Sequence, residues 1–217
     1  MKQLFVAALA LISFTSVNQA QAQKGLSLSV KGNPQLSWMH NEDDNDDNSL
    51  DMKPMPSASF GVGIGYGFTK NFGVQLDGLY AIQGRKFETN NNDLYQQVHY
   101  IKVAPMFTYT SPSIGIVSFT GKIGPQVSFL TSSKLTDDDG DKVMGNMNDL
   151  YEKVTFGGVS NLGAQFQLTK KLFLTSGIRF DMDFTNAENE DHVNYPSNRA
   201  TTLNSSLGLE LGVKFQL

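Results

Sequence analysis

Six carboxylate side chains lie within the ten residues 42–51, where they form a set of potential metal ligands. Ca²⁺ is a hard cation that prefers such oxygen ligands. A run of like charges is more typical of a solvated loop, because the charges repel one another. We favour the solvated loop and retain a weak calcium candidate made of Asp43, Asp44, Asp46 and Asp47.

A second acidic run, Asp137–Asp141, superficially resembles the start of an EF-hand because Gly140 lies within it. EF-hand spacing would place the first ligand at Leu135, whose side chain has no oxygen, and no glutamate stands at the closing position. The sequence therefore predicts no EF-hand here. Looser bridging of the acidic segments by divalent cations would need no ordered site.

Nucleophilic catalysis would need a serine or similar nucleophile beside a histidine that an acid orients. The chain has three histidines, His40, His99 and His192, and none begins a His-x-Ser pair. No serine lies in a Gly-x-Ser-x-Gly turn. A triad assembled from distant segments stays open, but the sequence predicts no catalytic residue and no cofactor.

The composition excludes several classes of protein. The 217 residues have a mean hydropathy of −0.25 and a net charge of −4. A helical protein with several membrane spans would need about 20 consecutive apolar residues for each span. No cysteine is present, so disulfides, thiolate metal sites and lipoprotein anchors are absent. The acidic balance gives no basic face for nucleic acid.

Residues 1–22 have the pattern of a cleaved secretory signal. Lys2 precedes the apolar stretch Leu4–Phe14, and Ala20-Gln21-Ala22 is a small-x-small cleavage site. The apolar stretch is too short to span a membrane as a helix. We expect export and a mature domain covering residues 23–217.

The mature chain shows apolar residues at alternate positions, which is the pattern of strands with one apolar and one polar face. Eight segments have this pattern: 26–38, 60–68, 72–83, 100–109, 117–129, 154–168, 172–184 and 203–217. Long polar links, 39–57, 84–97, 131–153 and 185–199, alternate with the short links 69–71, 110–115 and 169–171. An even strand number with long loops at one end and tight turns at the other predicts an all-β fold, an eight-stranded antiparallel up-and-down transmembrane β-barrel.

The polar face distinguishes a membrane barrel from a soluble periplasmic barrel, the main alternative. It carries 11 glycines and many small polar residues, which suit the narrow interior of eight strands better than a water-exposed surface. Its charges can pair inside the barrel, as buried charges must. These interior charges are Lys31, Asp77, Lys102, Lys122, Arg179, Asp181, Asp183, Glu210 and Lys214.

The interior charges have two interpretations. The cluster of Arg179 with Asp181, Asp183 and Glu210 is expected to be a satisfied ion-pair plug, and a functional polar relay is the alternative. The long links contain 17 of the 21 acidic residues and seven basic ones, a net charge of −10. No acidic residue falls on the apolar face, which we expect to contact lipid.

The sequence resembles the small outer-membrane β-barrel family common in Bacteroidetes, including PorT-like and OmpX-like barrels. The resemblance covers nearly all of residues 24–217, and its best signals are Tyr100–Pro105, Gly121–Pro125 and Gly212–Leu217. The last segment resembles the terminal signal that the barrel-assembly machinery recognises, although Leu211 stands where a polar residue is usual. The PorT-like members imply a secretion-linked role for some of the family.

We therefore predict a non-enzymatic integral protein of the cell outer membrane, either structural or presenting acidic extracellular loops for binding or adhesion. The termini would be periplasmic, and the partners would be outer-membrane lipid, lipopolysaccharide and the barrel-assembly machinery. A PorT-like accessory of a secretion system is the alternative, and a lipid-modifying outer-membrane enzyme is a more remote one. A general diffusion pore is disfavoured because eight strands leave no aqueous channel.

Overall fold

A computed structural model describes residues 24–43, 51–88, 93–193, 195–196 and 199–217. The predicted signal peptide, 1–22, lies outside these ranges. Three of the four calcium candidates, Asp44, Asp46 and Asp47, lie outside them too.

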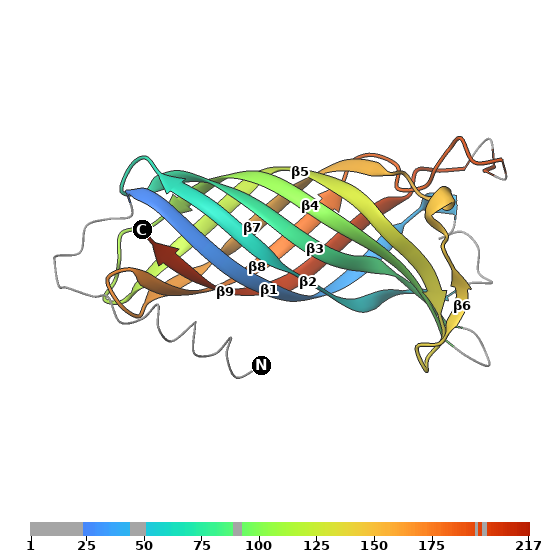
Figure 1. Ribbon diagram of the computed structural model, residues 1–217, viewed down its shortest axis with the longest axis horizontal. Coiled ribbons are helices and arrows are strands. Elements are labelled where there is room, and N and C mark those ends of the chain that lie inside the picture. The colour runs from blue at the N-terminus through green and yellow to red at the C-terminus, as the bar shows by residue number, and fades with distance from the viewer. Residues whose placement is uncertain (1–23, 44–50, 89–92, 194, 197–198) are drawn as a thin grey trace.

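The described chain forms one antiparallel sheet that closes on itself (Figure 1). Eight of its nine described strands make the barrel wall, in the order β4-β3-β2-β1-β9-β8-β7-β5, and β5 pairs with β4 to close it. The short β6 pairs only with β5 among the described residues. The strands are β1 (Gly25–His40), β2 (Asp51–Gly67), β3 (Phe72–Glu88), β4 (Leu94–Thr110), β5 (Val117–Thr136), β6 (Lys142–Gly145), β7 (Val154–Gln167), β8 (Leu172–Asp183) and β9 (Leu203–Gln216). The eight-stranded barrel predicted from the period-two pattern is confirmed.

Side chains alternate across the wall as the pattern predicts. Along β1, Lys31 and Asn33 are buried in the interior, whereas Val30 and Leu36 are exposed on the outer surface. Every wall strand places large apolar residues on that outer surface. We call this continuous outer surface the apolar band. It is the surface that a membrane barrel turns toward lipid.

Close contact between neighbouring backbones explains one of the interior glycines. A Cβ atom on Gly61 of β2 would lie 2.0 Å from the carbonyl oxygen of Gly78 on β3. No side chain fits at that distance, so the strands approach only because residue 61 lacks one.

The two ends of the barrel differ in construction (Figure 1). The links between β2 and β3, β4 and β5, and β7 and β8 are short and lie at the end where β9 finishes, which we call the short-turn end. The ends of the wall strands that the other links join, together with β6, lie at the opposite end, which we call the long-loop end. Within the described ranges, no helix has the length and apolarity to cross a membrane.

Four strands continue further toward the long-loop end than predicted. Residues 51–57, 84–88, 94–97 and 131–136 were expected in loops, but they belong to β2, β3, β4 and β5. The predicted links also contain residues 39–40, which belong to β1, and residues 142–145, which form β6. Their backbones remain paired, for example Arg85 with Gln96 and Gln97 with Lys134. Beyond the apolar band neither face must be apolar, so the period-two signal disappears while the hydrogen-bonded ladder continues.

Loops at the long-loop end fold over the mouth of the barrel. Five buried side chains, Met39, Val98, Tyr100, Tyr151 and Ala187, pack together there, and we call this cluster the cap. Backbone hydrogen bonds join the two loops that contribute to the cap, including the Glu152 amide to the Ala187 carbonyl at 2.9 Å. The cap therefore packs two loop residues, Tyr151 and Ala187, against residues of β1 and β4 at this end.

Candidate functional site: the charged interior of the barrel

Arg179 lies at the centre of the interior charges, with 1% of its surface exposed. Its position on β8 points inward because Ile178 and Phe180 on either side face the outer surface. The guanidinium binds Asp181 in a bidentate manner, through Nε to Oδ2 and Nη2 to Oδ1, both at 3.1 Å. Such paired bonds fix both the distance and the orientation of the two groups.

The second edge of the Arg179 guanidinium reaches two other strands. Nη1 donates to Asp77 Oδ2 on β3 and to Glu210 Oε2 on β9, each at 3.2 Å. Asp77 lies 102 residues away from Arg179 in the sequence. One cation thus links three carboxylates on three strands and spans the interior.

Two lysines complete this network. Lys31 Nζ on β1 lies 2.8 Å from Asp77 Oδ2 and 3.7 Å from Glu210 Oε1. Lys122 Nζ on β5 lies 3.0 Å from Glu210 Oε1. Asp77 and Glu210 therefore each contact Arg179 and at least one lysine, which is how buried charges avoid an uncompensated desolvation cost.

Lys102 joins the network through a neutral bridge that sequence reasoning missed. With its amide turned so that nitrogen faces the carboxylate, Gln126 donates to Asp181 Oδ1 at 2.6 Å and accepts from Lys102 Nζ at 3.1 Å. We assign this orientation because the opposite one leaves only a 3.4 Å contact with Arg179. Gln126 is on the inward register of β5, but it carries no charge, so the pattern of interior charges does not reveal it.

Two of the predicted ion-pair residues have other hydrogen-bond partners. Asp183 Oδ2 accepts hydrogen bonds from Thr155 Oγ1 at 3.0 Å and from Asn204 Nδ2 at 3.2 Å. Both of these donors are neutral, whereas the sequence predicts a cationic partner. Lys214 Nζ donates to Gln165 Oε1 at 2.6 Å and lies 4.9 Å from the centre of the Phe173 ring. These two residues lie toward opposite ends of the barrel, away from the Arg179 network.

The described hydrogen bond of the His99 side chain joins it to a tyrosine and not to a serine. His99 Nδ1 is 2.7 Å from the Tyr80 hydroxyl, and the described contacts of its other ring nitrogen include no hydrogen bond. Among the described residues, no three histidines, aspartates or glutamates gather as a metal site. Asp43, the calcium candidate within the described ranges, accepts a hydrogen bond from the Ala200 amide at 2.6 Å.

A separate charged cluster lies beyond the apolar band on the extended strands β2 and β3. Glu88 accepts hydrogen bonds from Lys53 and from Lys86, the latter at 3.1 Å, and Lys86 also pairs with Asp93. The hydrogen bonds from Lys53 and Lys86 lower the pKa of Glu88. The bonds to Asp93 and Glu88 raise the pKa of Lys86.

The comparison with protein families gives one match. The family model described as outer membrane protein beta-barrel domain matches residues 19–189. No curated protein matches the chain.

The chain is similar to several solved structures at low sequence identity. Neisserial surface protein A (NspA) is 12% identical, with a TM-score of 0.51 and coverage of 89% of this chain and 98% of its own. OprG from Pseudomonas aeruginosa is 12% identical, with a TM-score of 0.49 and coverage of 92% and 100%. Ail, the attachment invasion locus protein of Yersinia pestis, is 15% identical, with a TM-score of 0.43 and coverage of 88% and 99%. At these identities the likeness concerns the fold alone.

Proposed function

Because the chain belongs to the outer membrane protein β-barrel domain family, we propose that it is a non-enzymatic outer-membrane scaffold presenting its long-loop end outside the cell to a binding partner. The observation that carries this proposal is the construction of that end. Strands β2 to β5 continue past the apolar band, and the buried side chains of the cap pack together at the same end of the barrel. A rigid platform with variable loops is a common way to hold a binding surface.

The interior supports a scaffold better than a pathway. Arg179 occupies its centre with hydrogen bonds to Asp77, Asp181 and Glu210, and the cap packs side chains together at the long-loop end. Opening a route would expose or break buried charge pairs, which is costly. A general diffusion function is therefore disfavoured.

The orientation follows from the usual arrangement of such barrels, in which short turns face the periplasm and longer loops face outward. The termini would then be periplasmic, and the apolar band would contact outer-membrane lipid, with lipopolysaccharide beside the long loops. The segment Gly212–Leu217 would engage the barrel-assembly machinery before β9 pairs with β1. That pairing, which includes Lys31 with Gly212, closes the barrel.

Among the described residues of the long-loop end, the β5–β6 hairpin places two neighbouring apolar side chains where a partner could contact them. Val143 and Met144 are 55% and 53% exposed, and all four residues of β6 are exposed. The neighbouring acidic run Asp137–Asp141 gives the hairpin a negative surface. A partner with a basic rim around an apolar centre would match it.

The test replaces the two apolar side chains of the hairpin. Cells lacking the protein would be complemented with the wild-type chain, with Val143→Ser/Met144→Ser, or with Ile114→Ser/Ile116→Ser as a control. The control changes two residues that are also highly exposed but lie in a short turn. We expect the hairpin variant, and not the control, to lose surface attachment of the cells.

Other outcomes would redirect the assignment. Loss of secreted proteins on deletion, with attachment unchanged, would support the secretion accessory suggested by the PorT-like resemblance. Attachment and envelope integrity unchanged on deletion would contradict the scaffold proposal. Modified lipopolysaccharide that disappears on deletion would support the enzyme alternative.

A further inference from the structure

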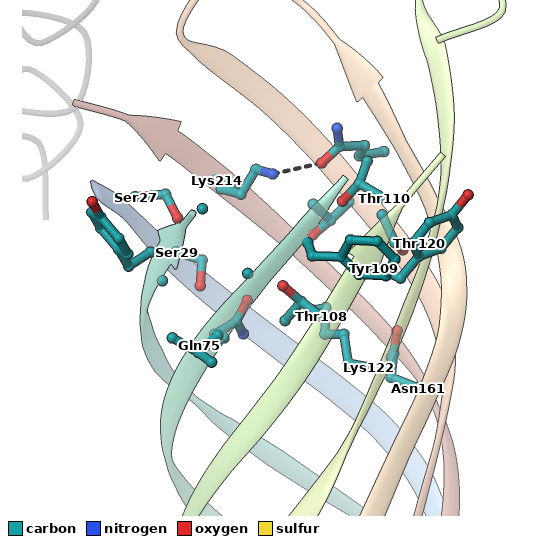
Figure 2. A pocket seen from close by; sticks show the side chains of 18 of the residues that line it. Ser27, Ser29, Gln75, Thr108, Tyr109, Thr110, Thr120, Lys122, Asn161 and Lys214 are labelled. Atoms are coloured by element: carbon teal, nitrogen blue, oxygen red, sulfur yellow. Dashed lines mark hydrogen bonds between the residues drawn. The ribbon is translucent and has the colours of Figure 1, made fainter. Parts of the chain in front are cut away.

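The interior opens into a polar recess at the short-turn end (Figure 2). Its volume is about 60 Å³, and Lys122, Asn161 and Lys214 lie around it. At roughly 10–15 Å³ for each water position, this space holds about four waters or one small polyatomic ion. The recess is distinct from the cap and lies at the opposite end of the barrel.

Two amide side chains in the recess leave a donor without a partner. Asn161 and Gln165, both on β7, are 3% and 2% exposed and line the recess. Neither the Asn161 Nδ2 nor the Gln165 Nε2 atom has a hydrogen-bond partner within the described chain. A buried amide nitrogen without a partner carries a desolvation cost that a bound acceptor would remove.

The chemistry of the unpartnered atoms changes along the interior. Among the inward-facing side chains of the long-loop half they are oxygens, on Asn33, Gln83, Ser128, Asp183 and Asn204. His99 Nε2 also lacks a partner, but His99 lies on the outward register of β4, between the buried residues Val98 and Tyr100. In the recess they are the two amide nitrogens. The recess therefore selects for a ligand that accepts hydrogen bonds.

The charges of the recess have the same preference. Lys31, Lys122 and Lys214 all line the recess, so three ammonium groups of like charge surround it. Glu210 is the carboxylate among the recess-lining residues, and it already contacts Arg179, Lys31 and Lys122. A small anion would reduce the repulsion among the ammonium groups.

Lys214 and Gln165 form one side of the recess as a unit. Lys214 donates to Gln165 Oε1 at 2.6 Å, the dashed line in Figure 2, and this contact commits the amide oxygen while leaving the nitrogen available. Hydroxyl groups of Thr120 and Thr175 also line the space. Ammonium, amide and hydroxyl donors around a small hollow are the groups that hydrogen-bond a tetrahedral oxyanion.

We propose that this recess is a binding site for a small tetrahedral oxyanion, a phosphate group, held between Lys122 and Lys214 and by the amides of Asn161 and Gln165. The phosphate group could belong to free inorganic phosphate or to a small phosphomonoester. The site is independent of the proposed surface function, because it lies at the other end of the barrel.

The test is a titration of the full chain, folded in detergent micelles and labelled with ¹⁵N, with sodium phosphate at constant ionic strength. Sodium chloride is the matched titrant, and the side-chain amide signals of Asn161 and Gln165 are followed. We expect saturable shifts with phosphate and none with chloride. A parallel titration with glycerol 3-phosphate separates the sources: binding of both indicates recognition of an exposed phosphate group, and binding of phosphate alone indicates the free ion.

Three variants complete the test. Gln165→Glu retains an acceptor for Lys214 but replaces the amide donor with a negative charge, and we expect about tenfold weaker binding or more. Lys214→Met should weaken binding similarly, whereas Lys170→Met, in the exposed turn between β7 and β8, should not. Heat-modifiable mobility on a gel checks that each variant is folded. Equal responses to phosphate and chloride, or undiminished binding by folded Gln165→Glu, would overturn the proposal.

Discussion

Removal of the Arg179 side chain should be among the most destabilising single changes in the barrel. Arg179→Ala deletes four hydrogen bonds to charged oxygens, two on Asp181 and one each on Asp77 and Glu210. It leaves these three buried carboxylates with Lys31, Lys122 and Lys102 as the cations of the network, and Lys102 reaches Asp181 only through Gln126. Asp181 then loses Arg179, its direct partner among the described ion pairs, and keeps only neutral hydrogen-bond donors.

The magnitude follows from the burial of these groups. Single hydrogen bonds to charged groups contribute about 1.5–3 kcal/mol each, but such contributions do not add within one network. Breaking a buried ion pair by removing one partner typically costs about 3–5 kcal/mol. We adopt this range and not the larger sum of four hydrogen bonds, because water that enters the vacated space can solvate the remaining carboxylates. Lys70→Ala, in an exposed turn, should cost less than about 0.5 kcal/mol.

Urea unfolding in detergent micelles measures the difference. The single tryptophan, Trp38 on β1, reports unfolding by fluorescence. With a slope of about 2 kcal/mol per molar urea, the Arg179→Ala midpoint should fall by roughly 1.5–2.5 M. The double variant Arg179→Ala/Asp181→Asn should be less destabilised than the sum of its parts, because it also removes one of the uncompensated charges.

Equal midpoints for Arg179→Ala and Lys70→Ala would refute this account of the interior. So would additive effects in the double variant, since they would mean that Arg179 and Asp181 do not interact.

Three further predictions concern the long-loop end. Gly84 has φ +151°, and a Cβ atom there would lie 1.8 Å from a backbone oxygen on β4, so Gly84→Ala should lower the urea midpoint. Gly145→Ala should leave the midpoint unchanged, because a Cβ atom on Gly145 would have no atom within 4 Å. Tyr151 is buried in the cap, so Tyr151→Ala should undock the two loops and speed trypsin cleavage of the 131–153 link, and an unchanged cleavage rate would count against the cap. Hydrogen bonds from Lys53 and Lys86 lower the pKa of Glu88 in the folded protein. Ionised Glu88 should therefore stabilise the fold above the pKa that it has in the unfolded chain, and this contribution should be lost as the pH falls through its pKa in the folded protein. In Lys86→Met, ¹³C NMR of the carboxyl group should show the pKa of Glu88 rising toward its ordinary value.

The sequence was most informative where lipid imposes a pattern. In the apolar band each strand must turn apolar residues outward, so Val30, Ile64 and Leu209 alternate with polar neighbours and the strands were predictable. Residues 51–57 and 131–136 lie beyond the band. There the wall continues without an apolar face, and no sequence period revealed it.

The partners inside the barrel were harder to predict than its lining. Inward positions follow from parity along each strand, which placed Arg179 and Asp77 in the interior. Which of these residues lie at the same level along the barrel axis depends on the stagger between neighbouring strands. The period-two pattern does not specify that stagger. For that reason the neutral partners of Asp183, Thr155 and Asn204, emerged only from the structure.

The central claim is that a folded long-loop end faces the outside of the cell. The chain has no cysteine, so a single introduced thiol can report its own accessibility. Val193 at the long-loop end is 95% exposed, and Lys70 lies in an exposed short turn at the opposite end. Intact cells carrying Val193→Cys should react with a membrane-impermeant maleimide, and cells carrying Lys70→Cys should react only after the outer membrane is permeabilised. The reverse pattern of labelling would contradict the proposed orientation and with it the surface function.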